Sequence, residues 1–340
     1  MSAVLAVVLT AVAIPPLAAR AVGGEPPDPY PRLAALAPLA APVAFAGVVV
    51  AAATSWWLAL LLAVPAITLL AWQLPPARRA GGEAAPVPGQ VPDPGPGALT
   101  LRVLSLNVLG GSADPAAVVR AIERHRVDVL VVQELTPGMV HRLAAAGIDA
   151  LLPYCHVDPR PKAGGTGLWA RWPLTPLPPV PGMVAAAPRA LIQPVDGCPV
   201  MVTGVHPKAP TRRNVRRWQQ ELAAIRSTLV NTDGHQLVAG DFNASRDHRP
   251  FRDLLAAGFL DCADAARRRP WPGFTWPAGR WIPPVMRLDH VLVSRGGATV
   301  RESRVIRVPG TDHRGVLAVI QLTFRPPRAT APPARPSPPG

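Results

Sequence analysis

Apolar residues are distributed unevenly along this chain, and two long runs near its beginning contain no charged side chain. The runs cover residues 2–19 and 33–74. The second run is about twice the ~20 residues that cross a bilayer, and the sequence Thr54-Ser55-Trp56-Trp57 divides it. Because tryptophan gathers at membrane–water interfaces, we predict two membrane helices, 33–53 and 57–74, joined by a tight turn. A buried hairpin of a soluble protein is the alternative.

The first apolar run permits two interpretations. It is a third membrane span, or it is a signal peptide that is removed from the mature protein. Pro15 and Pro16 interrupt the run, and Met1 and Ser2 supply no basic region of the kind that begins a signal peptide. We therefore predict a membrane anchor of three helices over residues 1–74.

After the apolar runs, the pattern becomes that of a folded domain between two proline-rich segments. The composition of residues 75–98 predicts a semi-rigid linker, and that of residues 326–340 predicts a disordered tail. Between them, residues 99–325 contain apolar β-rich runs and runs of helical periodicity. The predicted strands are 101–108, 128–133, 167–171, 190–195, 200–206, 236–241, 287–293 and 316–324, and the predicted helices are 114–126, 137–146, 212–229 and 249–257. This order predicts an α+β or α/β sandwich.

Composition agrees with a chain that lies partly in lipid. Hydrophobic residues make up 49% of the 340 residues and charged residues 16%, whereas an average soluble domain has about 25% charged residues. The apolar content excludes disorder throughout the chain. The net charge of +14 comes almost entirely from arginine. It reflects either the codon bias of a GC-rich genome or a basic face that attracts phosphates or anionic headgroups.

Basic residues beside the apolar runs bear on the side of the membrane that the folded domain occupies. Four arginines lie on the side of the membrane from which the chain continues into the folded domain. Arg20 and Arg32 flank the loop after the first predicted span, and Arg78 and Arg79 follow the last span. The positive-inside rule therefore predicts a cytoplasmic domain.

The three cysteines, Cys155, Cys198 and Cys262, stand far apart with no Cys-x-x-Cys pair. This spacing excludes a zinc knuckle. We expect three buried thiols, and one disulfide with a free thiol is the alternative.

Polar residues stand at the ends of the apolar strands of the folded domain. Five predicted strands end in an acid, an amide or a histidine, and a sixth polar cluster precedes the last strand. These sequences are Ser105-Leu106-Asn107, Val132-Gln133-Glu134, Val205-His206, Gly240-Asp241-Phe242-Asn243, Leu288-Asp289-His290 and Thr311-Asp312-His313. Because packed strands deliver their ends to one rim of a sheet, we expect these side chains to converge on a ligand.

The chemistry of this set favours a hard divalent cation and a phosphate ester. Carboxylate and amide oxygens are ligands that Mg²⁺ and Mn²⁺ prefer. An aspartate beside a histidine fixes its tautomer, and an aspartate near a metal can orient the attacking water. Taken singly, each residue has a structural alternative such as a turn, a helix cap or a buried histidine. His290 follows Asp289 on the opposite face of its strand, so we expect it to be structural.

The motifs in this order resemble those of the endonuclease/exonuclease/phosphatase superfamily, which includes DNase I-like nucleases, sphingomyelinases and inositol-polyphosphate phosphatases. The resemblance covers residues 99–324 and rests on SLNV, VVQE, GTGLWARWPL, GVHPK, WQQEL, GDFN, RLDHVLVS and TDHRGVLAVI. It implies an α+β fold, a four-layer αββα sandwich of the DNase I-like type with its site at one rim. With its apolar beginning, the chain also resembles a membrane-bound bacterial branch of the superfamily. Some members of that branch are linked to glycopeptide-antibiotic resistance, and their domain is thought to face outward.

The resemblance also assigns roles at a metal and water site. Glu134 looks like the principal metal ligand, with Asn107 contributing and Asp312 helping to hold the metal or its network. Asp241 would align the attacking water. Asn243 would hydrogen-bond the phosphoryl oxygens.

Two histidines complete the roles that the resemblance implies. His313, oriented by Asp289, would contact the scissile phosphate, and His206 would stabilise the phosphate or the leaving group. One departure from the family pattern matters: Leu109 stands where some nucleases carry an acid. This departure weakens an assignment as an abasic-site nuclease.

The expected function is a membrane-tethered phosphoesterase, dependent on Mg²⁺ or Mn²⁺, that hydrolyses a phosphate ester by attack of water. The tether raises the effective concentration of substrates in the bilayer, so we expect a lipid-linked phosphate over nucleic acid. The alternatives are a metal-dependent nuclease and an inactive membrane-held module that binds anionic headgroups through arginines such as Arg212, Arg213, Arg216 and Arg217. We expect a multi-pass protein of the cell membrane without a protein partner. We give the resemblance more weight than the charge rule and expect the domain to lie outside the cytoplasm.

Overall fold

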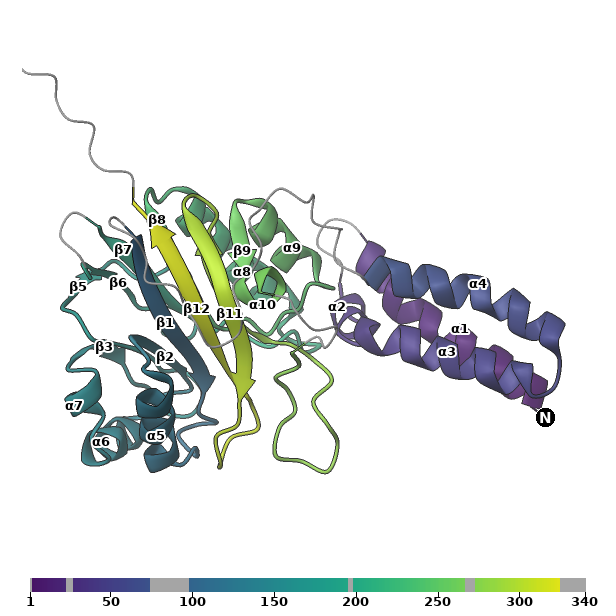
Figure 1. Cartoon of the computed structure of the whole chain (residues 1–340), viewed down its shortest axis with the longest axis horizontal. Coiled ribbons are helices and arrows are strands. Elements are labelled where there is room, and N and C mark those ends of the chain that lie inside the picture. Colours follow the sequence, from purple (N-terminus) through teal and green to yellow (C-terminus); the bar gives the residue numbers. More distant parts are fainter. Residues whose placement is uncertain (1, 23–26, 74–97, 195–197, 267–272, 325–340) are drawn as a thin grey trace, which may run out of the picture.

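A computed structural model describes residues 2–22, 27–73, 98–194, 198–266 and 273–324 (Figure 1). A slender bundle of helices extends from one side of a larger domain that contains two sheets. The predicted linker, 75–98, lies outside the described residues except for its last residue, and the predicted tail, 326–340, lies outside them entirely.

The bundle consists of α1 (Ser2–Ala21), α3 (Ala37–Ala52) and α4 (Trp56–Gln73), and the short α2 (Tyr30–Ala34) lies between the bundle and the domain (Figure 1). The helices α3 and α4 form a hairpin at the predicted place. Helix α1 continues through Pro15 and Pro16, the two prolines that interrupt its apolar run. A proline removes one helical hydrogen bond, and here the packing of Leu17 among alanines of α3 helps to hold the helix together.

Helix α1 is, among the described residues, the one helix long and apolar enough to cross a membrane. A signal sequence would meet the same criteria. The other apolar helical stretches, Ala37–Ala52 and Trp56–Ile67, are shorter. The anchor of three spans therefore stays a prediction.

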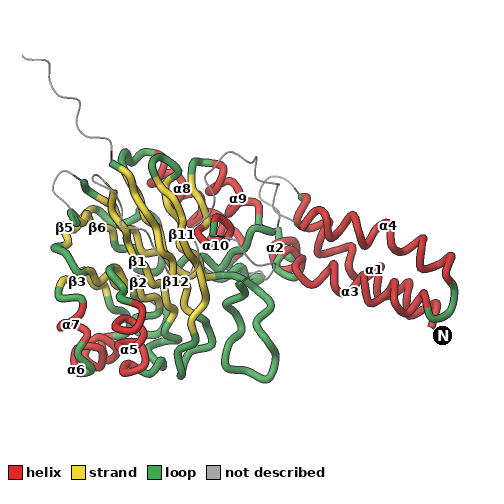
Figure 2. Tube along the Cα trace, in the orientation of Figure 1, coloured by secondary structure: helices red, strands yellow, loops and turns green. Residues whose placement is uncertain are grey.

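Two six-stranded sheets form the centre of the domain (Figures 1 and 2). The first has the order β11-β12-β1-β2-β4-β3, and the second has the order β5-β6-β7-β8-β10-β9. The strands of the first sheet are β1 (Ala98–Asn107), β2 (Val129–Gln133), β3 (Tyr154–Asp158), β4 (Thr166–Ala170), β11 (Ala298–Ile306) and β12 (Gly315–Thr323). Those of the second are β5 (Leu174–Leu177), β6 (Arg189–Ile192), β7 (Val200–Val205), β8 (His235–Asp241), β9 (Phe259–Asp261) and β10 (Asp289–Ser294).

Hydrophobic cores join four layers. Side chains from both sheets, such as Val131 and Val202, fill the space between them. The outer face of the first sheet is covered by α5 (Pro115–His125), α6 (Pro137–Ala145) and α7 (Ile148–Leu151), and that of the second by α8 (Val215–Val230) and α9 (Arg249–Ala256). The short α10 (Cys262–Ala265) follows β9. The domain is the predicted four-layer αββα sandwich.

Local sequence signals explain where these elements begin. Asp114 caps α5 by accepting a hydrogen bond from the Ala116 N–H, and Pro115 occupies the first helical position. All eight predicted strands and all four predicted helices of the domain occur. The strands that were not predicted, β3, β5, β9 and β11, are the edge strands of the two sheets.

Strand pairing brings several polar segments to one rim of the sandwich. The strands β1 and β2 are parallel, and Asn107 lies opposite Gln133. The strands β8 and β10 are antiparallel, and Asp241 lies opposite Asp289. Because β12 runs antiparallel to β1, the turn that precedes Gly315 reaches the same rim.

All three cysteines are free. Cys262 is buried, whereas Cys155 is exposed and Cys198 is half-buried. The expectation of three buried thiols is therefore wrong for two of them, because Cys155 lies on the edge strand β3, whose outer side nothing in the described chain covers.

Candidate active site

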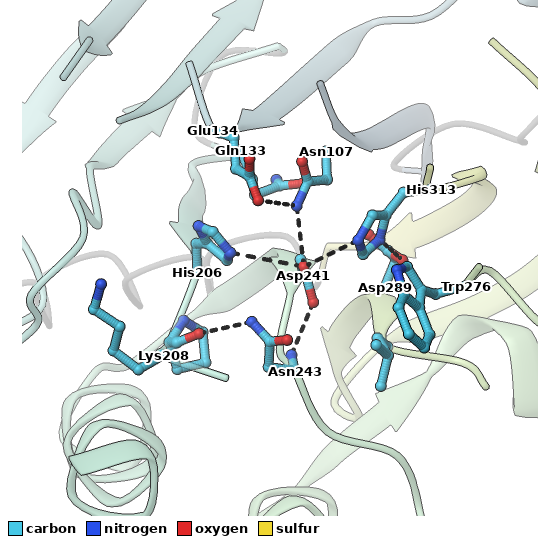
Figure 3. Close-up of polar contacts among 12 residues, drawn as sticks. Asn107, Gln133, Glu134, His206, Lys208, Asp241, Asn243, Trp276, Asp289 and His313 are labelled. Carbon is cyan, nitrogen blue, oxygen red and sulfur yellow. Dashed lines mark hydrogen bonds and ion pairs between the residues drawn. The ribbon is translucent and has the colours of Figure 1, made fainter. Parts of the chain in front are cut away.

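Asp241 occupies the centre of a polar cluster at this rim (Figure 3). It is the last residue of β8 and is 2% exposed. The surrounding side chains come from the ends of β1, β2 and β7, the loop after β8, the start of β10 and the turn before β12. They are Asn107, Glu134, His206, Asn243, Asp289, Asp312 and His313. The structure thus brings all eight predicted site residues together.

Asn107 links two carboxylates of the cluster. Its Nδ2 donates to Glu134 Oε1 and to Asp241 Oδ2, each at 3.1 Å. Its Oδ1 accepts from the Leu109 N–H at 2.9 Å, and the Gly110 N–H donates to Glu134 Oε2 at 2.8 Å. The turn after β1 therefore fixes both side chains, and Asn107 presents its amide nitrogen to the carboxylates.

Both oxygens of Asp241 face donors or imidazole rings. Oδ1 accepts from the Asn243 N–H at 2.9 Å. Oδ2 lies 3.7 Å from Nε2 of His206 and 3.7 Å from Nε2 of His313. Asn243 Nδ2 donates to the carbonyl of Pro207 at 2.9 Å, which ties the loop after β8 to the loop after β7. These contacts fix the orientation of the Asp241 carboxylate.

His313 and Asp289 form a buried pair. His313 Nδ1 lies 2.8 Å from Asp289 Oδ2. Burial by itself would lower the pKa of His313, but the charges of Asp289 and Asp241 outweigh it and raise the pKa to about 10. The two carboxylates therefore favour the protonated imidazole, and its Nδ1–H donates to Asp289.

The donor atoms of the cluster suit a hard cation. Asp241, Asp289 and His313 each place one ligand atom within 4.8 Å of the others. Within the described part of the chain, Asp289 Oδ1 and Asp312 Oδ1 are buried and accept no hydrogen bond. Trp276 Nε1 donates to the other Asp312 oxygen at 3.3 Å. Carboxylate oxygens left without donors in this way fit a divalent metal such as Mg²⁺ or Mn²⁺.

Backbone strain is concentrated at the same place. Leu109, Glu134 and Asn243 have φ values of 49°, 57° and 47°, in the left-handed region. A non-glycine residue held there costs about 1 kcal/mol or more, with a smaller cost for asparagine than for leucine or glutamate, and it stays there only when its surroundings fix it. Strain of this kind gathers at functional sites, where it aims side chains that regular strands would direct elsewhere.

Three supporting residues were not predicted from the sequence. Thr311 Oγ1 donates to the Asn107 carbonyl at 2.7 Å, and Thr275 Oγ1 accepts from the Asp289 N–H at 3.3 Å. The third is Trp276, which holds Asp312. Thr311 is part of the predicted motif Thr311-Asp312-His313 and could have been found, whereas Thr275 and Trp276 lie in an irregular segment without a recognisable pattern.

His290 lies outside the cluster, on the opposite face of β10, as predicted. It is fully buried, and its Nδ1 lies 2.9 Å from Asp261 Oδ2. Its Nε2 lies 2.9 Å from the carbonyl of Ala244. The protein therefore contains a second buried histidine–aspartate pair behind the first.

A family comparison decides the wider classification of the domain. The profile of the Endonuclease/Exonuclease/phosphatase family matches residues 104–313, which is more than half of the chain. The chain belongs to this family. Membership in the endonuclease/exonuclease/phosphatase family makes the protein a metal-dependent phosphoesterase in general terms. It also agrees with the order of the motifs along the chain.

Solved structures show the same fold. The structure of D. rerio TDP2 complexed with a single-strand DNA product is 17% identical with a TM-score of 0.54, covering 65% of this chain and 98% of that one. A functionally unknown conserved protein from Enterococcus faecalis V583 is 17% identical with a TM-score of 0.51, covering 65% and 99%. TDP2 from Caenorhabditis elegans is 15% identical with a TM-score of 0.53, covering 66% and 75%. None of the curated proteins compared with the chain matches it significantly.

Proposed function

We propose that this member of the endonuclease/exonuclease/phosphatase family is a membrane-tethered, divalent-metal-dependent hydrolase that cleaves a lipid-linked phosphate ester by attack of water. The observation that carries the catalytic part is the convergence of carboxylates, amides and histidines on Asp241 at one rim. The membrane part rests on the packing of the helical bundle.

Asp241 is the residue proposed to orient the attacking water and to accept its proton. A general base acts from within hydrogen-bond reach of the proton that it removes, and so it needs a fixed position. The Asn107 amide and the Asn243 N–H supply that position by holding one carboxylate oxygen each. One hydrogen of Asn243 Nδ2 is engaged by Pro207, and the second is proposed to donate to a phosphoryl oxygen.

The two histidines flank Asp241 and are proposed to bind the substrate phosphate. His313 carries a proton on both ring nitrogens, so it offers Nε2–H and a positive charge to phosphoryl oxygens that gain negative charge during hydrolysis. Asp289 orients this ring through Nδ1. His206 lies at the opposite side of Asp241 Oδ2 and is proposed to stabilise the phosphate or the leaving group.

Glu134, Asn107 and Asp312 are proposed to hold the metal ion. A divalent cation bound there would neutralise phosphate charge and stabilise the charge that develops during hydrolysis. Asp312 Oδ1 is buried and accepts no hydrogen bond from the described residues, which supports this assignment. Asn107 is proposed to contribute by holding the Glu134 carboxylate through Nδ2, while its Oδ1 accepts from the Leu109 N–H.

The helical bundle is packed in a way that supports a location in lipid. Small residues fill the contacts between its helices: Ala6, Ala40 and Ala44 are at most 1% exposed. A Cβ atom on Gly47 would meet the carbonyl of Ala6 at 2.9 Å. Large apolar side chains point outward instead, with 64–70% exposed for Val4, Phe45, Trp57, Leu61, Val64 and Ile67. Membrane helices pack through small residues and present large apolar residues to lipid.

We propose a multi-pass protein of the cell membrane whose catalytic domain lies outside the cytoplasm. The positive-inside rule predicts the opposite side, a cytoplasmic domain. Two of the arginines on which that prediction depends form ion pairs within the protein. Arg20 pairs with Asp247 at 3.3 Å, and Arg32 forms two hydrogen bonds with Asp28. A C-terminal reporter fusion, active on one side of the membrane only, tests this placement.

A lipid-linked substrate is favoured because an anchored site meets bilayer components at high effective concentration. Nucleic acid is the second candidate, and one observation favours it: D. rerio TDP2, which shares the fold, is complexed with a single-strand DNA product.

Hydrolysis by the purified full chain in detergent micelles tests these proposals. With Mg²⁺, we expect phosphate release from lipid phosphate monoesters or headgroup release from phosphodiesters, and little cleavage of single- or double-stranded DNA. EDTA should abolish the activity and added Mg²⁺ should restore it. Asp241→Asn should lower kcat by at least about 10³-fold, because it removes the proposed base. Asp233→Asn, which changes an exposed acid before β8, is the matched control and should keep full activity.

Two results would contradict the proposal. Turnover of DNA alone would replace the lipid substrate by nucleic acid. Absence of any turnover, together with an unchanged cellular phenotype for a folded Asp241→Asn protein, would favour a membrane-held binding module without catalysis.

A further inference from the structure

The anchor and the catalytic domain touch through a compact polar contact, in addition to their covalent connection. On the anchor side, the contact is formed by Arg20 at the end of α1 and by Pro31 in α2. On the domain side, it is formed by the loop that follows the GDFN motif, residues 244–248, and by α9 (Figure 1). We call residues 244–248 the brace loop.

His248 connects the brace loop to α2. Its Nδ1 accepts a hydrogen bond from the Ser245 N–H at 2.9 Å, so in the neutral ring the proton is on Nε2. Nε2 lies 2.8 Å from the Pro31 carbonyl and donates to it. The ring is 2% exposed and packs against Trp218 with a centroid distance of 5.2 Å. The buried side chain of His248 therefore makes one hydrogen bond within the brace loop and one to α2 of the anchor.

Arg20 makes a second connection a few residues away. Its Nε lies 3.3 Å from Asp247 Oδ1, and both side chains are only 12% exposed. Arg252 of α9 donates to the carbonyls of Arg20, Arg246 and Asp247 at 2.8–2.9 Å. The same guanidinium group thus joins the end of α1 to the brace loop. Burial raises the pKa of Asp247 despite the nearby Arg20, and removal of one partner from such a buried pair is costly because it leaves the other charge uncompensated.

The other end of the brace loop is held by the domain core. The Ala244 carbonyl accepts a hydrogen bond from Nε2 of His290, whose Nδ1 lies 2.9 Å from Asp261. Arg287 lies 3.3 Å from the same Asp261 oxygen. Ala244 directly follows Asn243, which is held at a φ of 47°. Contacts from the core and from the anchor therefore converge on the few residues that follow a strained site residue.

We propose that docking of Arg20 and α2 on the brace loop holds Asn243 in its catalytic conformation, so that hydrolysis depends on an anchor that is docked on the domain. The proposal rests on the proposed function of Asn243. A strained conformation persists only while its surroundings fix it, and two of the contacts that fix the brace loop come from the anchor: His248 with Pro31 and Arg20 with Asp247. Arg20 and His248 are positioning residues in this arrangement, since neither touches the reacting atoms.

The docked arrangement also fixes the direction in which the site faces. A domain held only by a proline-rich linker would sample many orientations above the bilayer. A domain held at Arg20 and α2 keeps its rim at one angle and one distance from the end of the bundle. Hydrolysis of a membrane-bound phosphate ester would gain from this constraint, because the reacting groups are brought together in one orientation.

Arg20→Gln in the full chain tests the proposal, because Arg20 lies outside the catalytic domain. Hydrolysis of bis(4-nitrophenyl) phosphate, a soluble diester that requires no bilayer, reports on the site itself. We expect kcat to fall five- to tenfold with little change in KM, and Arg20→Lys to restore most of the loss. Amide hydrogen exchange of residues 243–248 should become at least tenfold faster in Arg20→Gln.

Arg120→Gln is the matched control. Arg120 and Asp114 also form an ion pair, at 3.5 Å, but it lies within the domain and the Arg120 side chain is 67% exposed. This variant should change neither kcat nor exchange, because exposed pairs contribute little. Wild-type kcat and wild-type exchange in Arg20→Gln would overturn the proposal. Faster exchange, together with no hydrolysis by the wild-type protein of either this diester or the monoester 4-nitrophenyl phosphate, would instead show that docking is real and that the proposed function is wrong.

Discussion

Asp289 controls His313 through one hydrogen bond. Because Nδ1–H of the imidazole donates to Asp289 Oδ2, Nε2 is directed toward Asp241. The carboxylate also provides part of the charge that raises the pKa of the ring to about 10. An asparagine at this position would keep the size of the side chain but would remove the charge.

Asp289→Asn is therefore expected to lower kcat by about 10²–10⁴-fold, since a comparable exchange in a histidine–aspartate pair misorients the imidazole and removes its counter-charge. Steady-state hydrolysis by the full chain measures the effect. Circular dichroism and the melting temperature of the variant show whether the fold survives. A folded Asp289→Asn protein with unchanged kcat would exclude a catalytic role for the pair.

Most of the site was predictable because its residues stand in short motifs at strand ends. Asn107, Glu134, Asp241 and His313 fall where an apolar strand stops, and parallel or antiparallel pairing brings such ends together. Trp276 was not predictable. It reaches Asp312 from an irregular segment, and no periodicity in the sequence fixes the path of such a segment.

At the scale of elements, β7 and β8 lie unusually close to each other beside the site. A Cβ atom on Gly240 would collide with the carbonyl of Val205 in the parallel neighbour strand. Backbone atoms of a central strand cannot move aside without breaking their hydrogen bonds. Glycine is therefore required one residue before Asp241.

Gly240→Ala should lower the free energy of unfolding by more than about 2 kcal/mol, in the range of overpacked cores. Thermal or urea denaturation in detergent measures the loss. Gly138→Ala is the control, because nothing lies within 4 Å of a Cβ at this helical position. It should be neutral or slightly stabilising, since alanine favours a helix more than glycine does. Equal stability of the two variants would refute the close approach.

The docking contact between α2 and the brace loop should depend on pH. Burial lowers the pKa of His248 from 6.5 to about 4, so the folded protein keeps this ring neutral. A histidine whose pKa is lowered by folding contributes its full stabilisation of the folded state above pH 6.5. The protein loses this stabilisation as the pH falls from 6.5 toward 4. The shift corresponds to about 3 kcal/mol for a fully buried group.

Melting temperatures of the full chain at pH 7, 6, 5 and 4.5 test this expectation. The wild-type protein should lose more stability over this range than His248→Gln, whose side chain does not titrate. A fall of equal size in both proteins would assign the acid sensitivity to other groups, such as carboxylates.

The central strands of the domain were predictable from the sequence and the edge strands were not, because the two kinds of strand differ in burial. Strands buried on both faces, such as β2 and β8, read as continuous apolar runs. The edge strand β11 reads Ala-Thr-Val-Arg-Glu-Ser-Arg-Val-Ile and is half-exposed along most of its length. Its residues carry no period-two pattern, because β12 rather than burial specifies its register.

At the scale of the whole molecule, the bundle depends on the close approach of α1 and α3. A Cβ atom on Gly47 would meet Thr10 Oγ1 at 2.6 Å and the Ala6 carbonyl at 2.9 Å. Gly47→Leu should therefore separate the two helices and lower the melting temperature of the anchor in detergent. Val49→Leu, at a position that is 55% exposed, is the control and should have no effect. An unchanged melting temperature for Gly47→Leu would contradict this packing.

The exposed thiol of Cys155 can report on which side of the membrane the catalytic domain lies. Burial raises the pKa of both Cys155 and Cys262, but Cys262 is closed to a bulky reagent, whereas Cys155 is exposed and Cys198 is half-buried. A membrane-impermeant maleimide, applied at mildly alkaline pH, should therefore modify Cys155 more readily than Cys262. Modification in intact cells would place the sheet edge outside, and modification only after lysis would place it inside, without any engineered tag on the protein.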